Sequence, residues 1–193
     1  MCDNGTDASP LIVFLRGEDH MPKKKSELVE WVQAIVIAFI LSLLIKTFLF
    51  EVILVDGCSM EPTIYGGDRI IVTKLNYIKS TPERGDIIIF KNPDDMTLNY
   101  VKRVIGLEGD RIQIRDGVLY INDRPQREDY ITKPALADFD THIVPEGTIF
   151  VLGDNRNQSR DSRDPKVGFI PLKNIVGKAK LRIWPLKDFT LFQ

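Results

Sequence analysis

The chain is poor in the side chains that most enzymes use for nucleophilic or metal chemistry. Among its 193 residues are two histidines, His20 and His142, and two cysteines, Cys2 and Cys58. This scarcity excludes zinc fingers, Cys-x-x-Cys redox centres and disulfide-rich scaffolds, and we expect neither a metal ion nor a cofactor. With 26 basic and 27 acidic side chains, the chain also lacks the basic excess of a nucleic-acid-binding protein.

A long apolar segment lies near the N-terminus. Residues 31–45, WVQAIVIAFILSLLI, carry no charge, and the apolar run continues to Phe50 with one lysine. About 20 such residues span a bilayer as a helix, so we predict a transmembrane helix over residues 31–50. A soluble buried helix is one alternative, although core helices rarely stay apolar on all sides for this length. A cleaved signal peptide is another, but no small-x-small cleavage site follows the run.

Three lysines at positions 23–25 precede the predicted helix. Positively charged residues flanking a membrane span tend to stay in the cytoplasm. We therefore expect a single-pass protein of the cytoplasmic membrane, with residues 1–30 in the cytoplasm. Residues 51–193 would then form a domain on the extracytoplasmic face, and we expect this protein to be a monomer.

The segment after the predicted helix is dense in strand signals. Runs rich in branched and aromatic residues alternate with Gly, Pro, Asp and Asn, and no long helical period follows. Residues 111–122, RIQIRDGVLYIN, place an Asp-Gly pair between two alternating runs, which predicts a β-hairpin. The expected fold class is a mostly β, antiparallel catalytic domain tethered by one N-terminal transmembrane helix.

The predicted topology restricts which residues can act as nucleophile and base. Only His142 and Cys58 remain on the side of the β domain; His142 lies in a polar stretch typical of a loop, and nothing basic flanks Cys58. A serine can instead be activated by a lysine whose charged form is disfavoured by burial. Ser59 follows a Gly-containing bend, and Lys102 lies within an apolar strand. A lysine on such a strand is, however, more often simply exposed to solvent.

Five segments resemble, in order, the sequence boxes of the type I signal peptidases: GCSMEPTI, GDRIIVTKL, RGDIIIFKNP, YVKRVIGLEGD and FVLGDNRNQSRDSRDPKVGFIP. The resemblance extends over residues 31–185 and implies a serine endopeptidase that removes signal peptides from exported preproteins. It places the nucleophile at Ser59 and the general base at Lys102. Many family members carry a serine two residues before the nucleophile, where this chain has Gly57, which leaves the second oxyanion donor open.

The same resemblance implies supporting roles in the last box. Ser159 would hydrogen-bond the lysine, and Asp161 and Arg163 would form an ion pair that holds the loop. Arg103, next to the base, has two interpretations from the sequence: it lowers the lysine pKa by like-charge repulsion, or it is a simple exposed arginine.

An extended peptide would bind by β-addition, with alternate side chains entering pockets that favour small residues one and three positions before the cut. Position by position, the resemblance suggests eight wall residues, each equally plausible as a core residue: Ile53, Val55, Met60, Ile64, Ile70, Ile89, Tyr100 and Val101. The apolar C-terminal stretch WPLKDFTLFQ is interpreted either as a contact with membrane lipid or as a tail packed on the domain.

Two other functions stay open at this point. One keeps the serine and the lysine but changes the substrate, giving a self-cleaving or specialised processing peptidase. The other is a membrane-tethered domain that binds peptides without catalysis, in which the serine and the lysine are incidental.

Overall fold

The computed structural model describes residues 27–74 and 81–192, apart from the side chains of residues 44–48. The predicted cytoplasmic segment therefore lies almost entirely outside the described residues. Helix α1, Glu27–Phe48, contains the uncharged residues 31–45 and ends before the predicted limit, because Phe50 already belongs to a strand. Its described apolar side chains are spread around the whole circumference. Those that are described, such as Trp31 and Phe39, are exposed. Within the described residues, no helix meets the combined length and apolarity of a membrane span.

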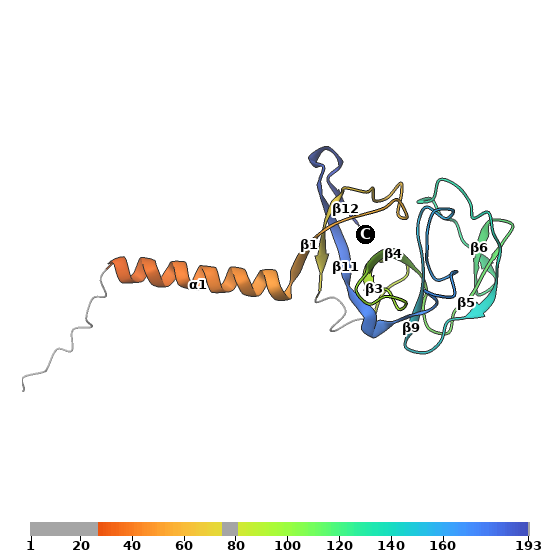
Figure 1. The fold of residues 1–193 in the computed structure, drawn as a ribbon, viewed down its shortest axis with the longest axis horizontal. Coiled ribbons are helices and arrows are strands. Elements are labelled where there is room, and N and C mark those ends of the chain that lie inside the picture. The colour runs from red at the N-terminus through yellow and green to blue at the C-terminus, as the bar shows by residue number, and fades with distance from the viewer. Residues whose placement is uncertain (1–26, 75–80, 193) are drawn as a thin grey trace, which may run out of the picture. The chain divides into compact units, whose positions relative to one another are not determined.

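The larger of two sheets is built from eight antiparallel strands. Seven follow the order β1-β2-β11-β3-β4-β9-β10, and β12 pairs with β11 (Figure 1). Their bounds are β1 Phe50–Leu54, β2 Arg69–Thr73, β3 Ile87–Lys91, β4 Asn99–Gly106, β9 Thr148–Leu152, β10 Ile170–Pro171, β11 Ile175–Trp184 and β12 Thr190–Leu191. Two short 3₁₀ helices, Leu172–Asn174 and Leu186–Asp188, flank β11.

A second sheet of four antiparallel strands has the order β7-β6-β5-β8. Its strands are β5 Arg111–Arg115, β6 Val118–Ile121, β7 Arg124–Pro125 and β8 Phe139–Ile143. The predicted hairpin is confirmed: β5 and β6 pair up to Arg115 and Val118, joined by Asp116 and Gly117 with φ of 51° and 75°. Both φ values are positive, as a tight primed turn requires. The mostly β, antiparallel fold class is likewise confirmed.

Strand β3 explains how the core is organised. Its run of four buried apolar residues has no polar face, because Ile87 and Ile89 pack into one hydrophobic cluster while Ile88 and Phe90 pack into another. A strand that is buried on both faces reads as a continuous apolar run. This central strand pairs with β4, and the register places Lys102 opposite Ile88, which sets the position of the lysine along the sheet.

Gly177 lies where β11 passes between β2 and β3. A Cβ atom there would lie 2.6 Å from the carbonyl oxygen of Thr73 and 2.6 Å from Cγ1 of Val72. Because a backbone oxygen cannot move away without disturbing the β2 pairing, Gly177→Ala is expected to lower the free energy of unfolding by about 1–3 kcal/mol. Denaturant titration followed by circular dichroism measures the change. Lys180→Ala in the same strand is the matched control, expected within about 0.5 kcal/mol of the wild type; an equally stable Gly177→Ala protein would contradict the close packing.

Candidate active site

Ser59 stands in the turn that follows β1. The chain leaves the strand through Gly57, whose φ of +88° reverses its direction, and then coils so that the Ile64 N–H donates to the Met60 carbonyl at 2.9 Å. The Ser59 carbonyl accepts a hydrogen bond from the Asn155 N–H at 3.0 Å. This contact ties the turn to the segment of residues 153–163, which follows β9.

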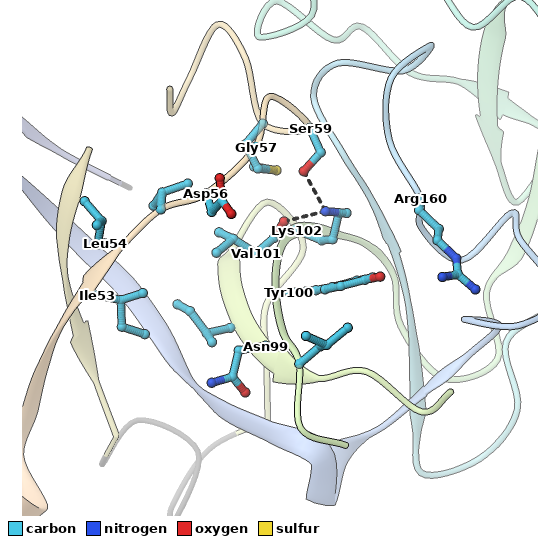
Figure 2. A pocket seen from close by; sticks show the side chains of 14 residues that line it. Ile53, Leu54, Asp56, Gly57, Ser59, Asn99, Tyr100, Val101, Lys102 and Arg160 are labelled. Atoms are coloured by element: carbon cyan, nitrogen blue, oxygen red, sulfur yellow. Dashed lines mark hydrogen bonds between the residues drawn. The ribbon is translucent and has the colours of Figure 1, made fainter. Parts of the chain in front are cut away.

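Lys102 reaches the serine from β4. Its Nζ lies 2.7 Å from Ser59 Oγ and donates to the Val101 carbonyl at 2.9 Å (Figure 2). The residue is 3% exposed. Burial lowers the pKa of Lys102 to about 8, although Asp161, Asp154 and Cys58 act in the opposite direction. Loss of hydration disfavours the ammonium form, so a large fraction of this amine is neutral near pH 8.

Arg103 fits neither of the interpretations drawn from the sequence. It is buried, and its Nε and Nη2 donate to the two carboxylate oxygens of Asp154 at 2.9 Å and 2.7 Å. Nη1 donates to the Gly85 carbonyl at 3.0 Å. The guanidinium charge is thus paired with a carboxylate rather than exposed, and the low pKa of Lys102 comes from burial rather than from repulsion.

The 153–163 segment contains the other predicted support residues. Asp161 and Arg163 form a two-pronged ion pair, with nitrogen–oxygen distances of 2.8 Å and 2.9 Å. Asp161 also accepts the Gly153 N–H at 3.0 Å. The expected hydrogen bond between Ser159 and Lys102 is not formed: Ser159 Oγ is buried and lacks a hydrogen-bond partner among the described residues. The reason is geometric, since the lysine amine is directed at Ser59 and the Val101 carbonyl.

A cleft of about 520 Å³ adjoins the serine and the lysine. Six of the eight predicted wall residues line it, namely Ile53, Val55, Met60, Ile89, Tyr100 and Val101. Ile64 and Ile70 do not; both are fully buried in the hydrophobic cluster that also contains Met60. Five further residues line the cleft and were not predicted from the sequence: Leu54, Asp56, Leu98, Asn99 and Arg160. In Figure 2, Arg160 lies on the opposite side of Lys102 from Ile53 and Leu54.

The other candidate base, His142, and the other candidate nucleophile, Cys58, form different hydrogen bonds. His142 belongs to strand β8 rather than to a loop, and its exposed ring lies 2.7 Å from the Asp140 carbonyl through Nδ1. Cys58, beside the serine, directs its thiol at Gln158 Oε1 at 3.3 Å. Within the described residues no group of three or more His, Cys, Asp or Glu side chains is arranged to hold a metal ion.

The family model described as "Signal peptidase, peptidase S26" matches residues 28–184. The chain belongs to this family. It is 42% identical to signal peptidase I of Bacillus licheniformis over 89% of this chain and 96% of the relative. It is also 42% identical to signal peptidase I T of Bacillus subtilis strain 168, over 86% and 90% of the two chains. A crystal structure of signal peptidase I from Enterococcus faecalis V583 is 37% identical, covers 51% of this chain and 97% of that one, and has a TM-score of 0.46.

Membership of this family makes the chain a type I signal peptidase and a serine endopeptidase, as the ordered sequence boxes predicted. The non-catalytic alternative is thereby set aside. Among the described residues that line the cleft, Ser59 is the one serine or threonine, and its hydroxyl has a lysine amine within hydrogen-bond distance.

The titration of Lys102 can be followed directly. In protein with ¹³C-labelled lysine, the Cε resonance of Lys102 is expected to move with a midpoint at a pH of about 8, because burial favours the neutral amine. The sign follows from the lowered pKa: the neutral form gains population as the pH rises through this midpoint. Lys102→Met assigns the resonance by removing it. A lysine spectrum with no such midpoint would show that the amine is hydrated.

Proposed function

We propose that this protein removes signal peptides from exported preproteins with Ser59 as nucleophile and Lys102 as general base. The observation that carries the proposal is the 2.7 Å contact between Ser59 Oγ and a buried amine whose pKa is lowered to about 8. A neutral amine is a base, and this amine lies within hydrogen-bond distance of the hydroxyl group whose proton must be removed.

The reaction is an acyl transfer in two steps. Neutral Lys102 accepts the proton of Ser59, Oγ attacks the scissile carbonyl, and the ammonium group then protonates the departing amine as the peptide bond breaks. The signal peptide is left as an ester on Ser59. Lys102, neutral again, deprotonates a water molecule that attacks the ester and releases the carboxylate, restoring the serine hydroxyl.

The negative charge that develops on the carbonyl oxygen needs a preorganised donor. The Ser59 N–H is suited to this role, because it forms no hydrogen bond with another described residue. Gly57 supplies no hydroxyl, so a second donor would come from the backbone of the same turn.

Two open strand edges favour an extended substrate. Among the described strands, β1 pairs with β2 on one side and with none on the other. β4 begins its pairing with β9 at Arg103, so residues 99–102 pair with no described strand on that side. The cleft lies along both edges, between residues 53–57 and 98–102. A peptide can add to such edges through main-chain hydrogen bonds, and its alternate side chains then face the apolar wall. Bulky wall residues such as Met60 and Tyr100 narrow the cleft and leave room only for small substrate side chains before the cut.

Replacing the proposed nucleophile tests the mechanism. Ser59→Ala is expected to abolish cleavage of a purified preprotein, a loss of at least about a thousandfold, because no acyl-enzyme can form. Lys102→Arg is expected to be equally inactive, since a guanidinium stays charged.

Cys58→Ala is the matched control, because it removes the neighbouring thiol and leaves the Ser59–Lys102 contact in place; we expect it to cleave. Cleavage by Ser59→Ala at the wild-type rate, measured by mass spectrometry of the products, would exclude the mechanism. Shortening of the chain without added preprotein would instead favour the self-cleaving alternative.

We also propose that α1, which contains most of the predicted span 31–50, anchors the protein in the cytoplasmic membrane as a single span, with the catalytic domain on the extracytoplasmic face. A helix the length of α1, 22 residues, rises about 33 Å, which matches a hydrocarbon core of about 30 Å. Further apolar side chains are exposed on the β domain and would extend the lipid contact, namely Phe50, Val52, Leu54, Trp184, Leu186, Phe189 and Leu191.

The anchoring proposal predicts how the full chain fractionates. It should stay in the membrane pellet after extraction with alkaline carbonate and leave it only with detergent, because an apolar span is not held by ionic contacts. Protease added to the extracytoplasmic face should digest the region after residue 50 and spare the N-terminal segment. Recovery of the intact chain in the carbonate supernatant would contradict the anchor.

A further inference from the structure

A buried cluster of charged and aromatic side chains connects the second sheet to the active site. Glu128 and Tyr130 lie in the connection between β7 and β8, outside the larger sheet. The Glu128 carboxylate accepts hydrogen bonds from Arg156 Nη1 and Nη2 at 2.6 Å each, and from the Tyr130 hydroxyl at 2.5 Å. The side chains of Arg156 and Glu128 are only 1% and 5% exposed.

The ring of Tyr130 lies against two guanidinium groups. Its centroid is 4.1 Å from Cζ of Arg103 and 5.9 Å from Cζ of Arg156. Cation–π contacts of this kind gain strength when water is excluded. One of the two arginines belongs to β4, directly after Lys102, and the other belongs to the 153–163 segment. A single aromatic ring thus contacts both structures that surround the proposed general base.

Arg156 connects the Glu128–Tyr130 cluster to the backbone that contacts Ser59. Its Nε donates to the Gly153 carbonyl at 3.0 Å, and its own carbonyl accepts a hydrogen bond from Arg163 at 2.6 Å. Between these points, the Asn155 N–H donates to the Ser59 carbonyl at 3.0 Å. Gly153 packs so closely that a Cβ atom there would collide with the same Ser59 carbonyl. Any shift of residues 153–156 therefore moves Ser59.

Arg103 is held at the other end of the cluster. It forms its ion pair with Asp154, whose second carboxylate oxygen also accepts the Thr63 hydroxyl at 2.5 Å. A buried arginine whose partner is displaced keeps an uncompensated charge, so the two ion pairs and the ring that separates them are expected to shift together.

We propose that Glu128 and Tyr130 are positioning residues for the reaction, which hold the 153–156 backbone and the Arg103 end of β4 so that Ser59 and Lys102 stay in contact. The inference rests on the proposed Ser59–Lys102 mechanism. It also assigns a role to the second sheet, because Glu128 and Tyr130 lie in the connection between its strands β7 and β8. Neither side chain lines the cleft, so neither is expected to contact the scissile bond.

Variants of Tyr130 separate positioning from simple stability. Tyr130→Leu removes the ring and is expected to lower kcat about tenfold while KM changes less than about twofold, because a small displacement of catalytic groups costs rate rather than binding. Tyr130→Phe keeps the ring between the two guanidinium groups and is expected to recover most of that loss. Both are measured on a peptide that spans a preprotein cleavage site, with rates divided by the folded fraction from circular dichroism.

The pH profile supplies a readout that a purely structural role would leave unmoved. Among the described residues, the ionisable groups that contact or act on Lys102 come from its own strand, the Ser59 turn and the 153–163 segment: Tyr100, Cys58, Asp154 and Asp161. Asp56 and Arg160 line the same cleft. Tyr130→Leu changes none of these charges. If the segment loosens and water reaches the amine, the midpoint of the kcat/KM profile moves to higher pH.

The matched control is Asp129→Asn, which breaks the exposed Arg127–Asp129 ion pair in the same turn and is expected to retain the wild-type kcat and pH midpoint. If Tyr130→Leu does not fold, Glu128→Gln serves as the test, with kcat expected to fall about fivefold because charge-assisted bonds to Arg156 become neutral ones. A folded Tyr130→Leu protein with wild-type kcat and midpoint overturns the inference. Equal losses in the Leu and Phe variants also overturn it, because the ring would then not carry the effect.

Ser59→Ala, assayed beside these variants, keeps the two proposals distinguishable. An inactive Ser59→Ala protein together with an unimpaired Tyr130→Leu protein refutes positioning alone. An active Ser59→Ala protein refutes the mechanism, and the positioning inference with it.

Discussion

The desolvation of one amine is the constraint on which the rest of the site depends. Lys102 is buried beside Ser59, and its only other hydrogen-bond acceptor in the described structure is the Val101 carbonyl. An ammonium group with so few partners and little water is unfavourable, so burial stabilises the neutral amine instead. The central strand β3 contributes to this burial, because Ile87, Ile88, Ile89 and Phe90 are all buried where the strand pairs with residues 100–103 of β4.

The carboxylates near the lysine would undo this effect if they stood alone. Asp154 and Asp161 both act to raise the pKa of Lys102, and each is itself buried. Each also has a guanidinium partner, Arg103 and Arg163 respectively, that compensates its charge at close range. Because a paired carboxylate projects a weaker field than a free one, burial remains the dominant influence on the lysine. Arg103 and Arg163 therefore influence Lys102 by compensating the charges of two nearby carboxylates rather than by repelling its ammonium form.

The sequence predicted local features better than contacts between distant segments. The hairpin followed from Asp116 and Gly117, and the fold class from the strand pattern, because both depend on neighbouring residues. Alternation along a strand does not reveal what faces it: Ile64 and Ile70 belong to the core although Met60, in the same cluster, lines the cleft. No sequence pattern pointed to Glu128 and Tyr130. Their partners come from β4 and the 153–163 segment, and contacts between segments so far apart cannot be inferred from a single sequence.

Lys102 must be shielded from water to stay neutral, whereas Ser59 in the same site must be accessible to substrate. The cleft opens along the unpaired edges of β1 and β4, so water reaches the front of the site before substrate binds. In the proposed mechanism, a peptide added to those edges covers this opening and completes the apolar surroundings of the amine. Desolvation is then greater in the complex than in the free enzyme, which favours the neutral base further once substrate is bound. In the proposed mechanism, substrate binding therefore also activates Lys102. The hydrogen bond from the Asn155 N–H to the Ser59 carbonyl would hold the serine in place while the peptide binds.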